Sequence, residues 1–296
     1  MKIDLQIHTT HSDGWDTPRR IAELASAGGL NIISVTDHDV VSAINEVQNE
    51  SSKFDIKVIA GTEISTTFRN KTLHILGYNM DIQNQELLDF LDRNNDYRKQ
   101  ALFNELLIVN ENLKKASKRE INIENYRNKG SKYYSQPGLA LFMYEEGITD
   151  SRAEGFDYFK GIESTMIPVE PVDAFRVIRQ AGGKVILSHP LGPKISLKQI
   201  SSDKSEQEKM IAEFSEHGLD GLECYGTGHN QEDTEFCLAM CEKYNLIITA
   251  GSDWHGSLEQ VGESVKKYLP YYIKKLGELI IPEESIQKMI KDLSIK

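Results

Sequence analysis

The chain has 296 residues, of which 39% are hydrophobic and 27% are charged, and its formal net charge is −11. No apolar run approaches the roughly 18 residues that a membrane-spanning helix needs, and the segment MKIDLQI lacks the basic-then-apolar order of a signal peptide. The acidic balance disfavours a broad nucleic-acid surface, because phosphate contacts need clustered Lys and Arg. We therefore expect a cytoplasmic globular protein without membrane association or stable binding of duplex nucleic acid, and the oligomeric state stays open.

Strand and helix signals alternate along the first part of the chain. The helix signal is strongest at Thr17, an N-cap residue followed by Pro18, and this helix should stop at a Gly-Gly pair. The other elements predicted here are an extended stretch at 1–7, strands at 30–35, 55–65 and 71–78, and a short helix at 40–49.

The pattern changes between residues 84 and 150. Helical spacing runs through 84–116 and returns at 137–147, with a polar stretch between them and no strand signal. We predict a helical insertion at 84–150 that interrupts a β/α barrel formed by 1–83 and 151–296.

Alternation resumes after the insertion. Helices are predicted at 169–183 and 231–245 and before Gly218, strands at 184–190, 219–225 and 246–251, and helical spacing in the tail at 271–280 and 283–293. Repeated strand–helix units favour an α/β fold with parallel strands, either open or closed into a barrel.

Groups able to bind a metal ion follow the predicted strands. Five of the eight histidines and several carboxylates occupy these positions, namely His8, Asp13, Asp37, His38, Asp39, Glu63, His74, His189, Asp253 and His255. Parallel β/α folds build their sites at the carboxyl ends of the strands. Mixed imidazole and carboxylate ligands suit zinc, manganese or iron, and two such ions would polarise a phosphoryl group and generate hydroxide near neutral pH. Cys237 and Cys241, one helical turn apart, are interpreted as helix packing.

These segments resemble the motifs of the PHP (polymerase and histidinol phosphatase) family. DLQIHTTHSDG resembles the family's D-L-H-x-H-[ST]-x-x-S-D-G, and VTDHD, GTEIS, HILGY, SHP and GSDWHG resemble its later motifs in the same order. The resemblance covers residues 1–83 and 155–256. The insertion and the GLDGLECY…H segment are similar to the branch of small phosphoesterases that act on 3′,5′-bisphosphorylated nucleosides and on RNA 5′ ends. The resemblance implies a distorted (β/α)7 barrel with a helical insertion.

The resemblance also implies a row of divalent ions (two or three of Mn, Zn or Fe) and assigns ligands to them. The first ion would be held by Gln6, His8, Glu63 and Asp253. Glu63 would bridge to a second ion on His74 and His189, and the third would lie on Asp13, His38 and His255. A hydroxide bridging two ions would attack phosphorus in line, with Glu63 as a catalytic residue.

Two further residues receive roles from the resemblance. His229 would contact phosphate or protonate the leaving oxygen, although it also fits a loop histidine without a role. Gln136 would face the substrate, where the branch has Arg-Pro-His and this chain has Gln136-Pro137-Gly138. Because Gln cannot replace the bidentate phosphate contact of Arg, another cation is needed, and the candidates are Lys132, Arg152, Arg176 and Lys194.

The second departure is Gln6, where the family has His. An amide oxygen is a neutral and weaker ligand, so the first ion should bind more loosely or be a harder ion.

The leading hypothesis is a metal-dependent phosphoesterase that hydrolyses a phosphate monoester of a small nucleotide-like substrate, meaning a nucleotide or an oligonucleotide. Histidinol phosphate is a second possible substrate. A non-catalytic metal- or ligand-binding protein on a degenerate scaffold is an alternative of another class. Retention of metal-capable residues at eight of nine implied ligand positions favours the enzyme.

Overall fold

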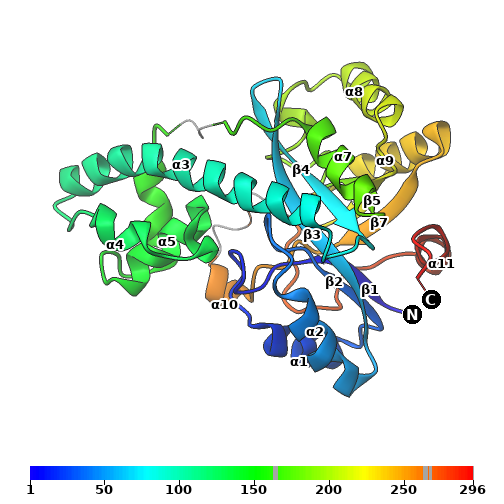
Figure 1. Ribbon diagram of the computed structural model, residues 1–296, viewed down its shortest axis with the longest axis horizontal. Coiled ribbons are helices and arrows are strands. Elements are labelled where there is room, and N and C mark those ends of the chain that lie inside the picture. Colours follow the sequence, from blue (N-terminus) through cyan, green and yellow to red (C-terminus); the bar gives the residue numbers. More distant parts are fainter. Residues whose placement is uncertain (163–165, 263–265, 267–268, 296) are drawn as a thin grey trace.

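The computed structural model describes residues 1–162, 166–262, 266 and 269–295 (Figure 1). A single sheet of seven strands runs in sequence order through the centre of the molecule. Its strands are β1 (Ile3–Ile7), β2 (Ile32–Val35), β3 (Lys57–Phe68), β4 (Lys71–Tyr78), β5 (Lys184–Leu187), β6 (Gly221–Gly226) and β7 (Ile247–Gly251).

The sheet closes into a barrel. The backbone N–H of His8 donates to the carbonyl of Trp254 at 2.8 Å, and the N–H of Trp254 donates to Gln6 at 3.3 Å. These bonds join the ends of β1 and β7, so the first and last strands are neighbours. The prediction of an α/β barrel of the (β/α)7 type is thereby confirmed.

One strand corrects the expectation of a parallel sheet. β1, β2 and β3 pair in parallel, as do β5, β6 and β7, but β4 runs antiparallel to both β3 and β5. The connection between β3 and β4 consists of Arg69 and Asn70, with φ angles of 48° and 60°. Two residues with positive φ form a tight hairpin turn, which is too short for the crossover that parallel strands need.

Helices cover the outside of the barrel. They are α1 (Pro18–Gly28), α2 (Ile44–Ser51), α7 (Pro171–Gln180), α8 (Lys204–Glu216) and α9 (Gln231–Tyr244). The limits predicted for α1 are confirmed, because the Thr17 hydroxyl accepts from the Arg20 N–H and Gly29 takes a left-handed φ of 71°.

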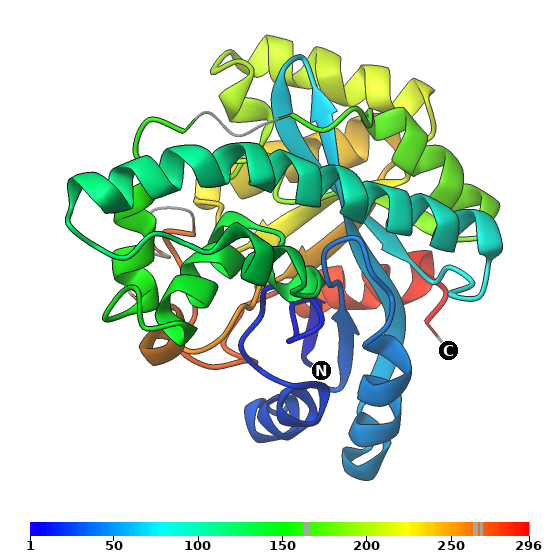
Figure 2. The same cartoon turned by 60° about the vertical axis from the view of Figure 1, so that its left-hand side comes forward.

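A second group of helices lies across one end of the barrel (Figure 2). It contains α3 (Gln85–Lys115), α4 (Ile123–Arg127), α5 (Gln136–Glu145), α6 (Arg152–Gly155) and the 3₁₀ turns η2 (Ser131–Tyr133) and η3 (Phe156–Phe159). Its core, which includes Leu106, Tyr126 and Phe142, is a hydrophobic cluster separate from that of the barrel. We call α3 to η3 the helical cap. The division into an insertion at 84–150 and a barrel of 1–83 and 151–296 stays a prediction.

The C-terminal tail closes the opposite end of the barrel. Helix α11 (Glu283–Asp292) packs Ile286 and Met289 against barrel residues such as Leu5, and it confirms the helix predicted at 283–293. The helix predicted at 271–280 is wrong, because these residues form turns. Gly277 there has a φ of 85° and lies so close to Gly28 that a Cβ would be 2.4 Å from its carbonyl oxygen. Residues 263–265, 267 and 268 of the tail lie outside the described part.

Among the described residues, no helix combines the length and apolarity needed to cross a bilayer.

Candidate metal centre and cavity

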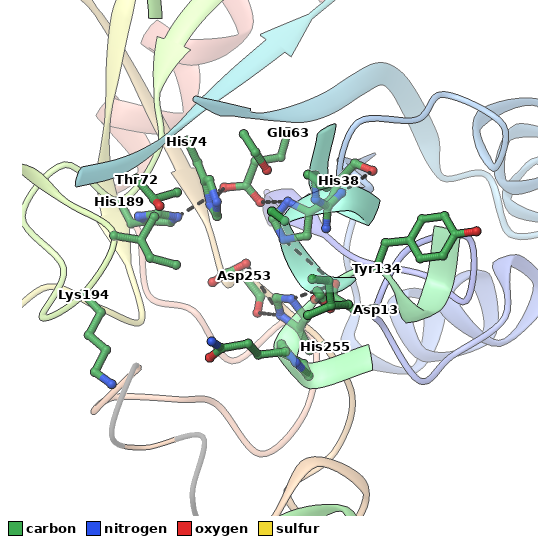
Figure 3. Close-up of a pocket in the computed structure, with 18 of the residues that line it drawn as sticks. Asp13, His38, Glu63, Thr72, His74, Tyr134, His189, Lys194, Asp253 and His255 are labelled. Carbon is green, nitrogen blue, oxygen red and sulfur yellow. Dashed lines mark hydrogen bonds and ion pairs between the residues drawn. The ribbon is translucent and has the colours of Figure 1, made fainter. Parts of the chain in front are cut away.

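The side chains predicted from the strand ends converge at the mouth of the barrel (Figure 3). They form three overlapping groups whose potential ligand atoms lie within 4.8 Å of one another: His8, Asp13, His38 and His255; His38, Glu63 and His74; and His8, Glu63 and Asp253. We call these residues, with His189, the ligand rim.

His8 occupies the centre of the ligand rim. Its Nε2 lies 3.1 Å from Glu63 Oε2 and 3.1 Å from Asp253 Oδ1, and its ring stacks on His255 with centroids 4.1 Å apart. Burial opposes a charge on this ring, but the contacts to Asp253 and Glu63 outweigh it and raise the pKa of His8 well above its ordinary value. A single imidazole nitrogen therefore faces two carboxylates.

Glu63 joins the groups through both of its carboxylate oxygens. Oε1 lies 3.1 Å from His74 Nδ1 and 3.2 Å from His189 Nε2. Oε2 faces His8 and, at 3.5 Å, His38 Nδ1. Burial alone would raise the pKa of Glu63, yet His74 and His38 hold it well below the ordinary range. A carboxylate placed in this way can bridge two cations.

The third group lies beside the helical cap. Asp13 Oδ1 is 3.3 Å from His255 Nε2 and 3.9 Å from His38 Nε2, and its Oδ2 accepts a hydrogen bond of 3.1 Å from the Ser135 hydroxyl. Although burial opposes ionisation, His255 and His38 keep the pKa of Asp13 well below its usual value. The cap thus contacts the ligand rim directly.

The ligand rim fits divalent cations. Within the described part of the chain, several of its buried polar atoms have no hydrogen-bond partner: His8 Nε2, Asp13 Oδ1, His38 Nδ1, His74 Nδ1 and Asp253 Oδ1. Buried polar groups normally have partners, because an unsatisfied one costs about 1–3 kcal/mol. Cations would satisfy these atoms together, and the mixed nitrogen and oxygen set suits zinc, manganese or iron.

Two ligand-rim residues adopt a strained backbone. His189 and Asp253 have φ angles of 28° and 53°, which non-glycine residues rarely take. Such strain concentrates at functional sites, where it directs a side chain. Here each residue lies two positions beyond the end of its strand, His189 after β5 and Asp253 after β7.

The predicted ligands Gln6 and His189 lie outside the three groups, but both contact Glu63. Gln6 is fully buried, and its Nε2 donates to Glu63 Oε1 and to the Ser188 hydroxyl, each at 2.9 Å. Its Oε1 is buried and has no partner in the part of the chain that the structure describes. The amide therefore acts as a donor to Glu63, and only its oxygen remains for an ion.

A cavity of about 300 Å³ opens above the ligand rim. The helical cap supplies one wall, with Glu105, Tyr134 and Gln136, and Lys194 stands on the other side (Figure 3). Gln136, predicted to face the substrate, donates from Nε2 to Glu105 at 3.0 Å.

His229 is held away from this cavity. Its Nδ1 bonds to the Cys224 carbonyl at 3.1 Å, and its Nε2 accepts from the Leu191 N–H at 3.2 Å. Burial lowers its pKa to about 4. Because both ring nitrogens are used by the backbone, this geometry does not support a contact with phosphate or a transferable proton.

Sequence reasoning missed Glu223. This buried residue of β6 accepts the His189 N–H at 2.9 Å through Oε2, and burial raises its pKa well above the ordinary value. This hydrogen bond stabilises the strained backbone conformation of His189. The only signal was an acidic residue between Leu222 and Cys224 in an apolar strand.

A barrel whose mouth holds histidines and carboxylates in overlapping groups is the architecture of a metal-dependent hydrolase. The sequence pattern of the PHP domain matches residues 4–165. The chain therefore belongs to the PHP domain family, which confirms the resemblance.

Relatives with names cover nearly the whole chain. It is 28% identical to the 5′-3′ exoribonuclease Rnm of Escherichia coli, over 93% of this chain and 92% of that protein. It is 22% identical to the 3′,5′-nucleoside bisphosphate phosphatase of Chromobacterium violaceum, over 86% and 87%. A solved structure from Bifidobacterium adolescentis shares the fold with a TM-score of 0.72, at 23% identity over 98% of this chain and 96% of that one.

Proposed function

We propose that this protein removes a terminal phosphate from a nucleotide or from the end of a short RNA, at the ligand rim. That it is a metal-dependent phosphoesterase, and hence a hydrolase, follows from its family and from the relatives described above. The substrate class, the number and identity of the ions and the residue roles are our proposal.

The observation that carries the proposal is the overlap of the three ligand groups. His8, His38 and Glu63 each belong to two groups, so the groups form one continuous row. Divalent ions in this row would polarise the phosphoryl oxygens and lower the pKa of water. The residues that would hold the ions are Gln6, His8, Asp13, His38, Glu63, His74, His189, Asp253 and His255.

The cavity supports a small substrate. At about 300 Å³ it lies at the lower end of the volumes of ligand pockets and would hold about one nucleotide. The names of two relatives, a 5′-3′ exoribonuclease and a 3′,5′-nucleoside bisphosphate phosphatase, describe activities on nucleotides or on RNA from an end. The strained backbone of His189 and Asp253 fixes these ligands before substrate arrives, which favours preorganised catalysis.

The test is release of inorganic phosphate from adenosine 3′,5′-bisphosphate and from a 5′-phosphorylated short RNA, with added Mn²⁺. We expect release by the parent protein and by Asp157→Asn, a matched control on the exposed surface, and none by Asp253→Asn. Metal content per chain is measured for all three. Absence of release from both substrates by a metal-loaded parent would refute the nucleotide proposal.

A further inference from the structure

Among the described residues, three cationic side chains line the cavity, namely Arg98, Arg152 and Lys194. Arg98 is committed to the loop after β2, because its NH1 donates to Asp39 Oδ2 at 3.0 Å and to the His38 carbonyl at 3.3 Å. Lys194 is exposed. Arg152, by contrast, is only 6% exposed.

Arg152 is fixed in place but not saturated. Its Nε donates to the Pro137 carbonyl at 3.2 Å, its NH2 makes a long contact of 3.4 Å to the Asp13 carbonyl, and its guanidinium lies 5.3 Å from the Trp15 ring centroid. Its NH1 is buried and has no hydrogen-bond partner among the residues that the structure describes. A guanidinium has five donors in a rigid fork, and leaving some of them buried and unsatisfied is unfavourable.

The surroundings of Arg152 suit an anion. An arginine guanidinium is charged at neutral pH, and this one lies on the cavity wall. Ser135 is the N-cap of α5, and the Pro137 carbonyl in the first turn of this helix accepts from Arg152. The positive end of the helix dipole therefore lies at the cavity wall. The other two cations named from the sequence lie elsewhere, since Lys132 pairs with Glu145 and Arg176 bonds to Gln180 on the surface.

We propose that Arg152 is a specificity-determining residue that binds a second, non-reacting phosphate group of the substrate. The inference rests on the proposed function. The reacting phosphate belongs at the row of ligands, whereas Arg152 lies on the cavity wall, where it contacts the Asp13 carbonyl and the Trp15 ring. A substrate with two phosphates would engage both places, and one with a single phosphate would engage only the ligand row.

The test compares equilibrium binding of adenosine 3′,5′-bisphosphate with that of the adenosine 3′- and 5′-monophosphates. Binding is measured by calorimetry with Mn²⁺ in the Asp253→Asn background, where we expect no turnover to disturb the heats. Arg152→Gln should weaken binding of the bisphosphate by about tenfold to about a hundredfold, the range for lost charged hydrogen bonds. Binding of the monophosphates should change by less than about threefold. Arg152→Lys should restore part of the loss, and Arg176→Gln, the exposed control, should change nothing.

Other outcomes are equally informative. Equal weakening for all three ligands would mean that Arg152 binds the reacting phosphate, and unchanged binding with a lowered melting temperature would make it a structural link between α6 and the Asp13 loop; either overturns the proposal. Phosphate release by the otherwise unmutated protein is measured separately. If binding depends on Arg152 but no phosphate is released, the proposed function fails and this inference stands.

Discussion

The ligand rim and the helical cap meet at one cavity but are built differently. Every ligand-rim residue lies on a barrel strand or in the loop that follows it, and Glu63 contacts partners from four other strands or the loops after them. The cap reaches the rim through few bonds, such as that from Ser135 to Asp13. The rim is therefore held by many mutual contacts and suits chemistry, whereas the cap can change without disturbing it and suits selection of the substrate.

The largest effect should come from the residue that joins the groups of the rim. Glu63→Gln keeps the shape but removes the charge that faces His8, His38 and His74, so cations would lose a shared ligand. We expect phosphate release to fall by about a thousandfold or more, the scale for loss of a catalytic group, with less bound metal and a melting temperature within a few degrees of the parent. Near-normal rates at unchanged metal content would show that the rim is not the site. Glu124→Gln, on the exposed cap, is the control.

Metal affinity should depend steeply on pH. Burial opposes a charge on His189, but its contact with Glu63 raises its pKa to about 9 in the chain without ions. Since an ion needs the neutral ring, binding must release this proton below pH 9, and affinity should rise by up to about tenfold per pH unit until then. Titrations with Mn²⁺ between pH 6.5 and 9, in buffers of different ionisation heat, measure the protons released. His189→Ala should flatten the slope, and an unchanged slope would contradict the assignment.

The same protonation of His189 stabilises the metal-free fold, so stability should fall as pH rises, whereas metal affinity should rise. A histidine whose folded pKa is raised contributes its full stabilisation below its unfolded value near 6.5 and loses it as pH rises through the folded value. The contribution of His189 should therefore make the metal-free protein melt at a lower temperature at pH 9.5 than at pH 6.5. His189→Ala should reduce this difference in melting temperature.

Gln6→His should strengthen the rim. The imidazole would replace an amide that now donates to Glu63 and Ser188, and zinc and iron favour imidazole as a ligand. We expect affinity for the most weakly held ion to rise by about tenfold, the lower end of the effects on metal affinity of residues around a bound ion. The measurement is the metal content after dialysis against increasing concentrations of chelator. Gln6→Asn, too short to span the same contacts, should not strengthen binding, and an equal gain in both variants would argue against a ligand effect.

The smallest effect should come from the contact between cap and rim. Ser135→Ala removes the hydrogen bond to Asp13 and the N-cap of α5, which costs about 1 kcal/mol of stability. We expect KM to rise by about two- to tenfold, with metal content unchanged. Asn122→Ala removes the N-cap of α4, without an Asp13 contact, and should lower stability alone. A fall in metal content in Ser135→Ala would mean that the cap is part of the metal centre.

Much of the fold could be predicted from local signals. Thr17 and Pro18 set the start of α1, and β-branched runs set the strands, because capping and burial depend on residues close in sequence. β4 was assigned as a strand, but its direction was not, although the Arg69-Asn70 turn carries the signal. The segment 271–280 has helical spacing yet forms turns packed against α1, because contacts with distant residues outweigh propensity.

The sequence by itself determined the residue types at or after the parallel strands, and hence most of the chemistry of the rim, because the carboxyl ends of parallel strands meet at the same edge of the barrel. His74 lies within the antiparallel β4, so its place at the mouth depends on the tertiary structure. Only the tertiary structure decided that His38 belongs to two ligand groups, that His229 is bound by backbone, and that Arg152 rather than Lys132 or Arg176 lines the cavity. These outcomes depend on where segments far apart in the chain meet. Arg152 and Asp13 are in contact although 139 positions separate them, and a local sequence pattern holds no information about such a contact.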